Sequence, residues 1–138
     1  MKKAKSAVAA AALVLLAAGA ARATNYVEQD EFKAWLLNGK KMQIVDIQPA
    51  AGYARHHFRG ALETNAFPAK TAEEKDRLNP VLPGLLATTD DVVVICPHGG
   101  GGAKNAYDYL ASKGVAEKRL YILEDGMEDW PYPELVQK

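Results

Sequence analysis

Apolar and polar positions alternate along this chain with two different periods. Phe32, Trp35 and Leu36 recur at helical spacing, and this spacing predicts an amphipathic helix over residues 28–38. An Asn-Gly pair then provides a helix stop. Short apolar runs bounded by polar or turn-forming residues predict strands at residues 42–47, 92–95 and 120–123.

Helical patterns lie between these strands. The longest is predicted over residues 103–113, with an apolar side formed by Ala106, Tyr109 and Leu110. Two shorter helices are expected, at residues 49–55 and after Thr71, which forms a capping box with Glu74. Strands that alternate with helices predict one α/β domain, a mostly parallel sheet flanked by helices. The β-branched run over residues 92–95 is typical of a strand covered on both faces.

The first 23 residues have the pattern of an export signal. Lys2, Lys3 and Lys5 precede an uncharged apolar run, and Ala21-Arg22-Ala23 is a cleavage pattern of small residues. The apolar run is short for a transmembrane helix. We therefore expect a signal peptide over residues 1–23, cleavage after Ala23 and a domain over residues 24–138. We also expect a periplasmic location without stable membrane association.

The charge balance depends on this leader. The whole chain has 17 Lys and Arg against 17 Asp and Glu. Removal of residues 1–23 takes four positive side chains and no negative one, so the remaining domain is acidic. An acidic domain argues against general binding to nucleic acid.

A single cysteine stands where the chemistry is expected. Cys96 follows the predicted strand and opens the run Pro97-His98-Gly99-Gly100-Gly101-Gly102-Ala103. Successive glycines let backbone N–H groups turn toward one point, and the helix that follows adds partial positive charge there. This arrangement predicts a nucleophilic thiolate in an anion cradle. A buried structural cysteine followed by a flexible loop is the alternative.

Four ordered segments resemble the rhodanese (sulfurtransferase) family over nearly all of the mature chain. Residues 44–48 are similar to the family's V-D-x-R strand, and residues 53–61 to its E-Y-x-x-G-H-I-x-G-A segment. Residues 93–96 resemble the strand that enters the catalytic cysteine, and residues 123–130 resemble L-x-G-G-x-x-x-W. The resemblance implies a single rhodanese-like domain in which Cys96 takes a sulfane sulfur from a small anionic donor. The sulfur would pass to a thiol or protein acceptor, with the backbone over residues 97–103 as the binding loop and without a cofactor.

The loop departs from the family pattern in two ways. Rhodanese loops often read C-R-x-G-x-R-S, whereas this loop has no arginine. Anion steering would then depend on His98 or on three cations outside the loop, Arg55, Arg59 and Lys104. The missing charge favours polysulfide over thiosulfate as the donor.

The second departure is one extra loop residue, counted from Cys96 to the helix positions matched by Ala106 and Leu110. In relatives that the chain resembles, a longer loop accommodates a larger tetrahedral anion. A cysteine-dependent phosphatase, or an arsenate or selenium oxyanion reductase, is therefore the first alternative. A non-catalytic sulfur carrier that serves a partner protein is the second.

Other polar candidates have structural interpretations. His56 and His57 are adjacent and therefore point in different directions, and no further ligand is evident, so no metal site is expected. The resemblance assigns His57 and Asp46 to holding neighbouring backbone, and Trp130 to packing.

Overall fold

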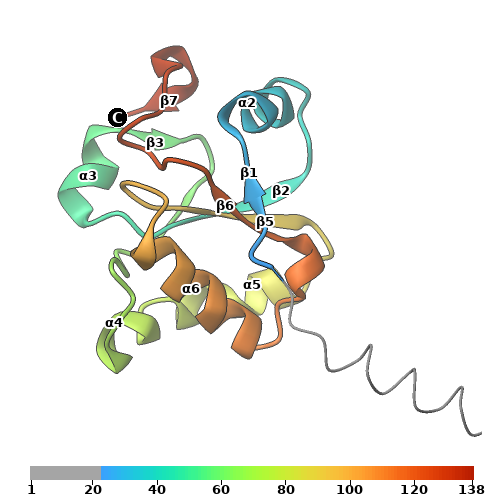
Figure 1. Ribbon diagram of the computed structural model, residues 1–138, viewed down its shortest axis with the longest axis vertical. Coiled ribbons are helices and arrows are strands. Elements are labelled where there is room, and N and C mark those ends of the chain that lie inside the picture. The colour runs from blue at the N-terminus through green and yellow to red at the C-terminus, as the bar shows by residue number, and fades with distance from the viewer. Residues whose placement is uncertain (1–22) are drawn as a thin grey trace, which may run out of the picture.

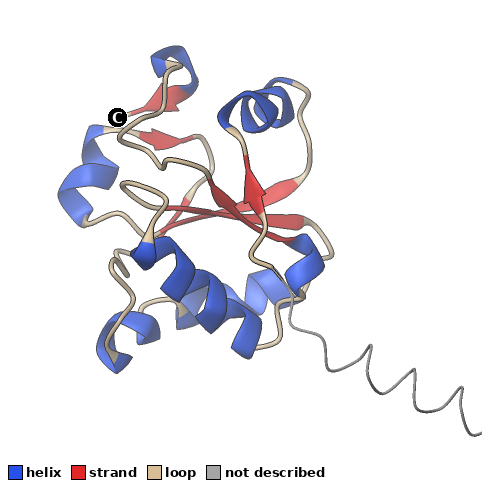
Figure 2. Cartoon of the chain, in the orientation of Figure 1, coloured by secondary structure: helices blue, strands red, loops and turns tan. Residues whose placement is uncertain are grey.

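A five-stranded parallel sheet forms the centre of the computed structural model, which describes residues 23–138 (Figures 1 and 2). The predicted export signal falls on residues 1–23 and thus lies almost wholly outside the described residues. The strands run in the order β1-β6-β5-β2-β4. Their bounds are β1 Tyr26–Val27, β2 Met42–Asp46, β4 Leu62–Glu63, β5 Asp91–Ile95 and β6 Leu120–Leu123.

Helices cover both faces of this sheet. On one face lie α4 (Ala72–Asp76), α5 (Leu82–Leu86) and α6 (Gly101–Ser112), drawn below the sheet in Figure 1. On the other face lie α2 (Gln29–Leu37), α3 (Ala50–Arg55) and a small antiparallel pair, β3 (His57–Phe58) with β7 (Val136–Gln137). The predicted α/β domain with a mostly parallel sheet is therefore confirmed.

Strand β5 explains why the sheet needs cover on both sides. Its residues are fully buried from Val92 to Ile95. Val92 and Val94 belong to the apolar cluster beneath α6, whereas Val93 and Ile95 belong to the cluster beneath α2. Successive side chains of a strand point to opposite faces, so a continuous β-branched run supplies both cores at once.

Helix α6 begins two residues earlier than its apolar pattern predicted. Gly100 is the N-cap, so Gly101 and Gly102 form its first turn. Ala106 and Leu110 are buried as expected, and Tyr107 is also buried although its position lies beside the predicted apolar stripe. The glycines of the loop thus continue directly into the helix.

Other elements follow or depart from the pattern for local reasons. The capping box of Thr71 and Glu74 is present at the start of α4. Pro80 and Pro83 lie in the first turns of a 3-10 helix and of α5, where no N–H is needed. The two-residue strands β1, β3 and β7 were missed, because such short strands carry no periodic signal.

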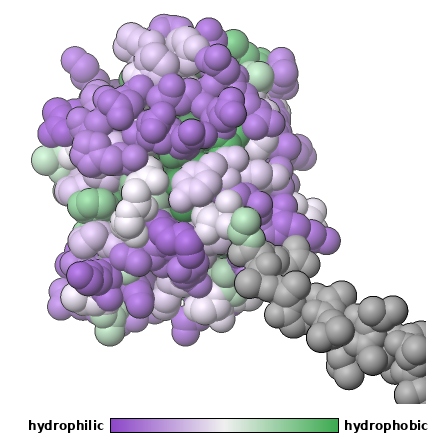
Figure 3. All heavy atoms as spheres, viewed as in Figure 1, coloured by the Kyte–Doolittle hydropathy of each residue, from purple (hydrophilic) through white to green (hydrophobic). Residues whose placement is uncertain are grey.

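The face drawn in Figure 3 is largely polar, with apolar colour in a hollow between polar rims and in a few separate spots. Among residues 23–138, no helix combines the length and the apolar character needed to cross a bilayer.

Candidate active site

The cysteine loop, defined here as residues 96–102, leaves the carboxyl end of β5 and turns into α6. Cys96 follows the last residue of β5 directly and has only 1% of its surface exposed. In parallel α/β sheets, ligands bind beyond the carboxyl ends of the strands. The thiol thus lies at the base of the loop, within reach only of a small or narrow group.

Backbone amides of the loop face the sulfur or remain free. The N–H of Gly99 donates to Cys96 Sγ across 2.8 Å. Gly99 has φ +71°, a left-handed conformation that glycine adopts without strain. Within residues 23–138, no acceptor takes the amides of Gly100, Gly101 or Gly102. These amides, at the N-terminus of a 12-residue helix, can therefore hold negative charge on a bound group.

A second backbone segment, the closing turn at residues 123–128, packs against the loop. The N–H of Met127 donates to the Cys96 carbonyl oxygen (2.8 Å), and the N–H of Glu128 donates to that of Pro97 (2.9 Å). Gly126 has φ +71°, and a Cβ added there would lie 2.6 Å from the Cys96 carbonyl oxygen and from the Gly99 nitrogen. Only glycine allows this contact.

The glycine run contains two kinds of position. A Cβ on Gly99 would lie 2.8 Å from the Asp125 nitrogen, and one on Gly102 would lie 2.6 Å from the Phe67 ring. A Cβ on Gly100 or Gly101 would meet nothing within 4 Å. Gly99 and Gly102 are therefore required by packing, whereas Gly100 and Gly101 face open space.

The remaining predicted loop residues have different surroundings. Pro97 has no N–H and its carbonyl is bonded to Glu128, so it shapes the loop without donating to a ligand. His98 is exposed, and Ala103 is buried in the first turn of α6.

The three cations considered for anion steering are not gathered at the loop. Arg55 pairs with Glu128 (3.5 Å), whose backbone contacts Pro97, so it lies beside the loop. Lys104 pairs with Asp108 (2.6 Å) along α6. Arg59 lines a separate cleft, described below.

Asp46 is a buried carboxyl at the end of β2, next to β5. It pairs in register with Ile95, the residue before the cysteine. Its Oδ1 accepts from the Gln48 N–H (2.8 Å) and its Oδ2 from Gln48 Nε2 (3.0 Å). Burial raises the pKa of Asp46 to about 6, although the hydrogen bonds from Gln48 oppose the shift.

Gln48 extends this network to α3. Its Nε2 also donates to the His56 carbonyl oxygen (3.1 Å), so one buried amide joins the end of β2 to the end of α3. Gln48 was not singled out from the sequence, although it stands where the family pattern has arginine. Gly52 makes room for it, because a Cβ there would lie 3.1 Å from Gln48 Oε1.

The two adjacent histidines have separate surroundings. His57 stacks on Tyr53 with ring centres 4.0 Å apart, and its Nδ1 lies 2.8 Å from the Tyr53 carbonyl oxygen. Nδ1 therefore carries the proton, because a carbonyl only accepts. His56 Nδ1 is buried without a partner in the part of the chain that the structure describes. That part also holds no cluster of three or more His, Cys, Asp or Glu side chains suited to a metal ion.

Comparison with known proteins assigns a family. The family model described as "Rhodanese-like domain" matches residues 28–131. A search of curated proteins found no match. Among solved structures, a yeast protein tyrosine phosphatase of the rhodanese family aligns at a TM-score of 0.67 with 20% identity, covering 85% of this chain and 93% of that one.

Two further structures show the range of proteins with this fold. An As-Sb reductase from Leishmania major aligns at a TM-score of 0.65 with 15% identity, covering 83% of this chain and 85% of that one. A thiosulfate sulfurtransferase from Pseudomonas aeruginosa aligns at 0.61 with 17% identity, covering 84% of this chain and 20% of the much longer enzyme. At these identities the likeness establishes the fold.

The two kinds of loop glycine should differ in stability. Gly99→Ala forces a side chain onto a left-handed backbone and against Asp125, so we expect a loss of about 3 kcal/mol or more in the free energy of unfolding. Gly101→Ala, the matched control, should leave stability unchanged or raise it by about 0.5 kcal/mol, because alanine is the better helix former. Urea unfolding checks both variants, and equal losses would contradict the packing described here.

Asp46 should make stability depend on pH. Its pKa is higher in the folded than in the unfolded chain, so its contribution is fully present below pH 4 and is lost as the pH rises through 6. Relative to Asp46→Asn, which cannot ionise, the native protein should lose about 2 kcal/mol between pH 4 and pH 7. Urea unfolding of both proteins across this range measures the difference, and parallel pH profiles would show that Asp46 is not perturbed.

Proposed function

The chain belongs to the rhodanese-like domain family, and from this membership we propose that it is a sulfurtransferase that carries sulfane sulfur on Cys96. One observation carries the proposal: the Gly99 N–H points at Cys96 Sγ, beside three amides at the start of α6 that have no acceptor among residues 23–138. A persulfide has its negative charge on the outer sulfur. Preorganised N–H groups stabilise such a charge without a metal or a buried counter-ion.

The first half-reaction loads the cysteine. The Cys96 thiolate attacks the terminal sulfane sulfur of a donor and forms a Cys96–S–S⁻ persulfide. The bond between that sulfur and the rest of the donor breaks, and its electron pair leaves with the donor. Thiosulfate would leave as sulfite, and a polysulfide would leave shorter by one sulfur. The two electrons stay within the sulfur atoms, so no external oxidant is needed.

The second half-reaction empties the cysteine. An acceptor thiolate attacks the outer sulfur of the persulfide, the S–S bond breaks and the Cys96 thiolate is restored. The outer sulfur then belongs to the acceptor as a new persulfide. Gly100 and Gly101 leave open space above the loop, which supports approach of the acceptor from that side.

The charges around the loop favour a donor whose negative charge is less concentrated than that of thiosulfate. The loop itself contains no arginine or lysine, and the side chain of Lys104 is held by Asp108. Arg55 remains, but it is shared with Glu128 at the edge of the loop. Polysulfide, a dianion whose charge is spread along a chain of sulfur atoms, therefore suits the site better than thiosulfate, whose charge is concentrated on a compact group.

The proposed location is the periplasm, on the strength of the leader pattern in residues 1–23. A single thiol with 1% exposure suits an oxidising compartment, because burial of the Cys96 sulfur limits its oxidation to a disulfide, whereas the acceptor attacks only the outer sulfur of the persulfide. A carrier that loads sulfur but delivers it only to a partner protein would share the first half-reaction and lack turnover with small acceptors.

Loading of Cys96 is the direct test of the proposal. Incubation with polysulfide should raise the intact mass of the protein by one sulfur atom, and cyanide should remove that mass as thiocyanate. Cys96→Ser should fold but gain no mass, because a hydroxyl does not form a persulfide. Sulfur gain by Cys96→Ser, or none by the native protein with either polysulfide or thiosulfate, would contradict the proposal.

A phosphatase assay tests the alternative that loop length favours. A cysteine-dependent phosphatase would release phosphate from an aryl phosphate, and this release would need Cys96. We expect no phosphate release, because the loop lacks the arginine that would hold the tetrahedral anion.

Arg55 should act on donor preference. Arg55→Gln should slow loading from thiosulfate about threefold at low salt and change loading from polysulfide less, because a charge at the rim mainly affects the encounter rate. Lys104→Gln is the matched control and should have little effect, since Asp108 already holds that charge. Loading rates followed by mass spectrometry, with and without added salt, measure both. Equal rates for Arg55→Gln and the native protein would exclude steering by Arg55.

A further inference from the structure

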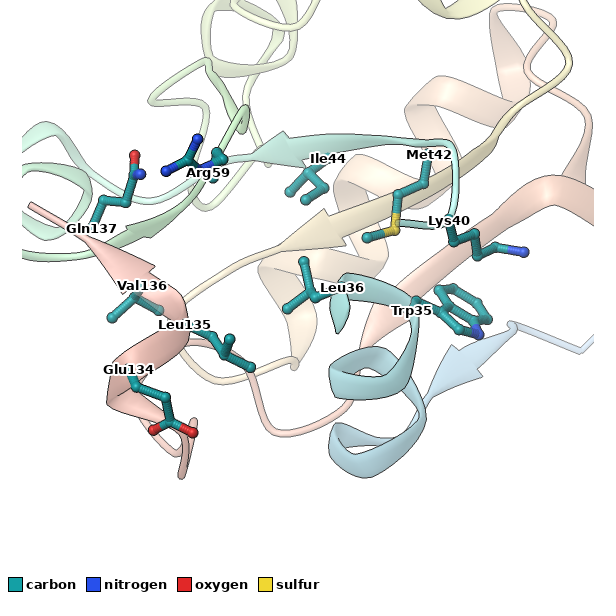
Figure 4. Close-up of a pocket in the computed structure, with 10 residues that line it drawn as sticks. All are labelled: Trp35, Leu36, Lys40, Met42, Ile44, Arg59, Glu134, Leu135, Val136 and Gln137. Carbon is teal, nitrogen blue, oxygen red and sulfur yellow. The ribbon is translucent and has the colours of Figure 1, made fainter. Parts of the chain in front are cut away.

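A cleft of about 410 Å³ lies between α2, β2 and β7, away from the cysteine loop (Figure 4). None of residues 96–103 contributes to its walls. Of its apolar lining residues, all but Leu135 belong to or pack against the cluster beneath α2, whereas Cys96 belongs to the cluster beneath α6. The proposed sulfur chemistry does not use this cleft.

The floor of the cleft is apolar. Met42 and Ile44 lie two residues apart on β2 and therefore face the same side of the strand. Figure 4 shows these side chains directed into the cleft, with Leu36 and Leu135 on its other walls. An apolar ligand lying here would cover hydrophobic surface that otherwise faces water.

The two cations at the rim of the cleft differ in their ion pairs. Lys40 pairs with Asp91 (3.1 Å), and its Nζ lies 4.6 Å from the centre of the Trp35 ring. Arg59, at the other end beside Gln137, has no ion pair within the described part of the chain. Glu134 lies across the cleft from Arg59 in Figure 4. One end of an apolar cleft thus carries a guanidinium that forms no ion pair with any of residues 23–138.

We propose that this cleft binds a small amphipathic carboxylate, with its apolar body on Met42 and Ile44 and its carboxylate on Arg59. The charge complementarity selects an anionic head group, and a guanidinium matches a carboxylate with two parallel N–H donors. The volume falls within the range of roughly 300–1,000 Å³ that is typical of small-molecule sites. A positive head group would be repelled by Arg59 and could pair only with Glu134 across the cleft, since Asp91 already holds the charge of Lys40.

Decanoate, below its micelle concentration, is the probe for this site. Titration of the native protein, followed by tryptophan fluorescence because Trp35 lines the cleft, should show one binding site with Kd below about 1 mM. Arg59→Gln should weaken decanoate binding about tenfold, the loss of one charge-assisted contact. Decanol should bind both proteins equally and less tightly than decanoate binds the native protein.

Two variants serve as controls for general charge effects. Arg55→Gln removes an equal charge outside the cleft and should leave decanoate binding unchanged. Glu134→Gln removes the opposing carboxylate and should leave binding equal or tighter. Cys96→Ser should bind decanoate as the native protein does, so this test stands apart from sulfur transfer.

Three results would overturn the proposal. The first is no saturable decanoate binding up to about 1 mM. The second is equal affinity for decanoate in Arg59→Gln and in the native protein, both correctly folded by circular dichroism. The third is a native dimer in sedimentation that Arg59→Gln disrupts and decanoate does not, since the cleft would then be an interface between copies of this chain.

Discussion

The close approach of two backbone segments, the cysteine loop and the closing turn, is the constraint on which the rest of the site depends. Gly99 and Gly126 both have φ +71°, and a side chain on either would collide with backbone of the other segment. The hydrogen bonds from Met127 and Glu128 to the first two loop carbonyls need this proximity. With those carbonyls engaged, the loop amides are free to face the sulfur. Backbone contacts thus hold the loop amides in place. The loop is ordered by these contacts although it contains no arginine or lysine.

Most of the fold follows from patterns that are visible in the sequence. Strands β2, β5 and β6 and helices α2 and α6 were predicted within one or two residues, because each has a clear period or a continuous β-branched run. The short strands β1, β3 and β7 depend on partners far along the chain, and two residues carry no period. Cys96 and the glycines were also identified from the sequence. The different roles of Gly99 and Gly101 were not, since they depend on Asp125 and open space, which no local pattern records.

The uncharged hydrogen-bond partner of Asp46 shows how this domain does without the arginine of the V-D-x-R pattern. Gln48 stands in that place and offers an amide instead of a positive charge. An amide satisfies the carboxylate oxygens but does not neutralise them, so burial is the largest influence and the pKa of Asp46 rises to about 6. The same amide bonds the His56 carbonyl, which fixes the end of α3 where Arg55 begins its reach toward Glu128. An uncharged residue thus helps to fix the end of the helix that carries Arg55, a cation beside the loop.

Strand β2 joins the two regions to which function is ascribed. Met42, Ile44 and Asp46 are every second residue of the strand, so their side chains lie on the same face. The first two meet the cleft beneath α2, and the third lies beside the residue that precedes Cys96. In a parallel sheet, ligands bind at the carboxyl ends of the strands. Asp46, the polar residue of the three, lies at that end of β2. Met42 and Ile44, nearer the start of the strand, take no part in that chemistry. The elements packed on them, α2 and β7, decide which ligand the cleft can bind.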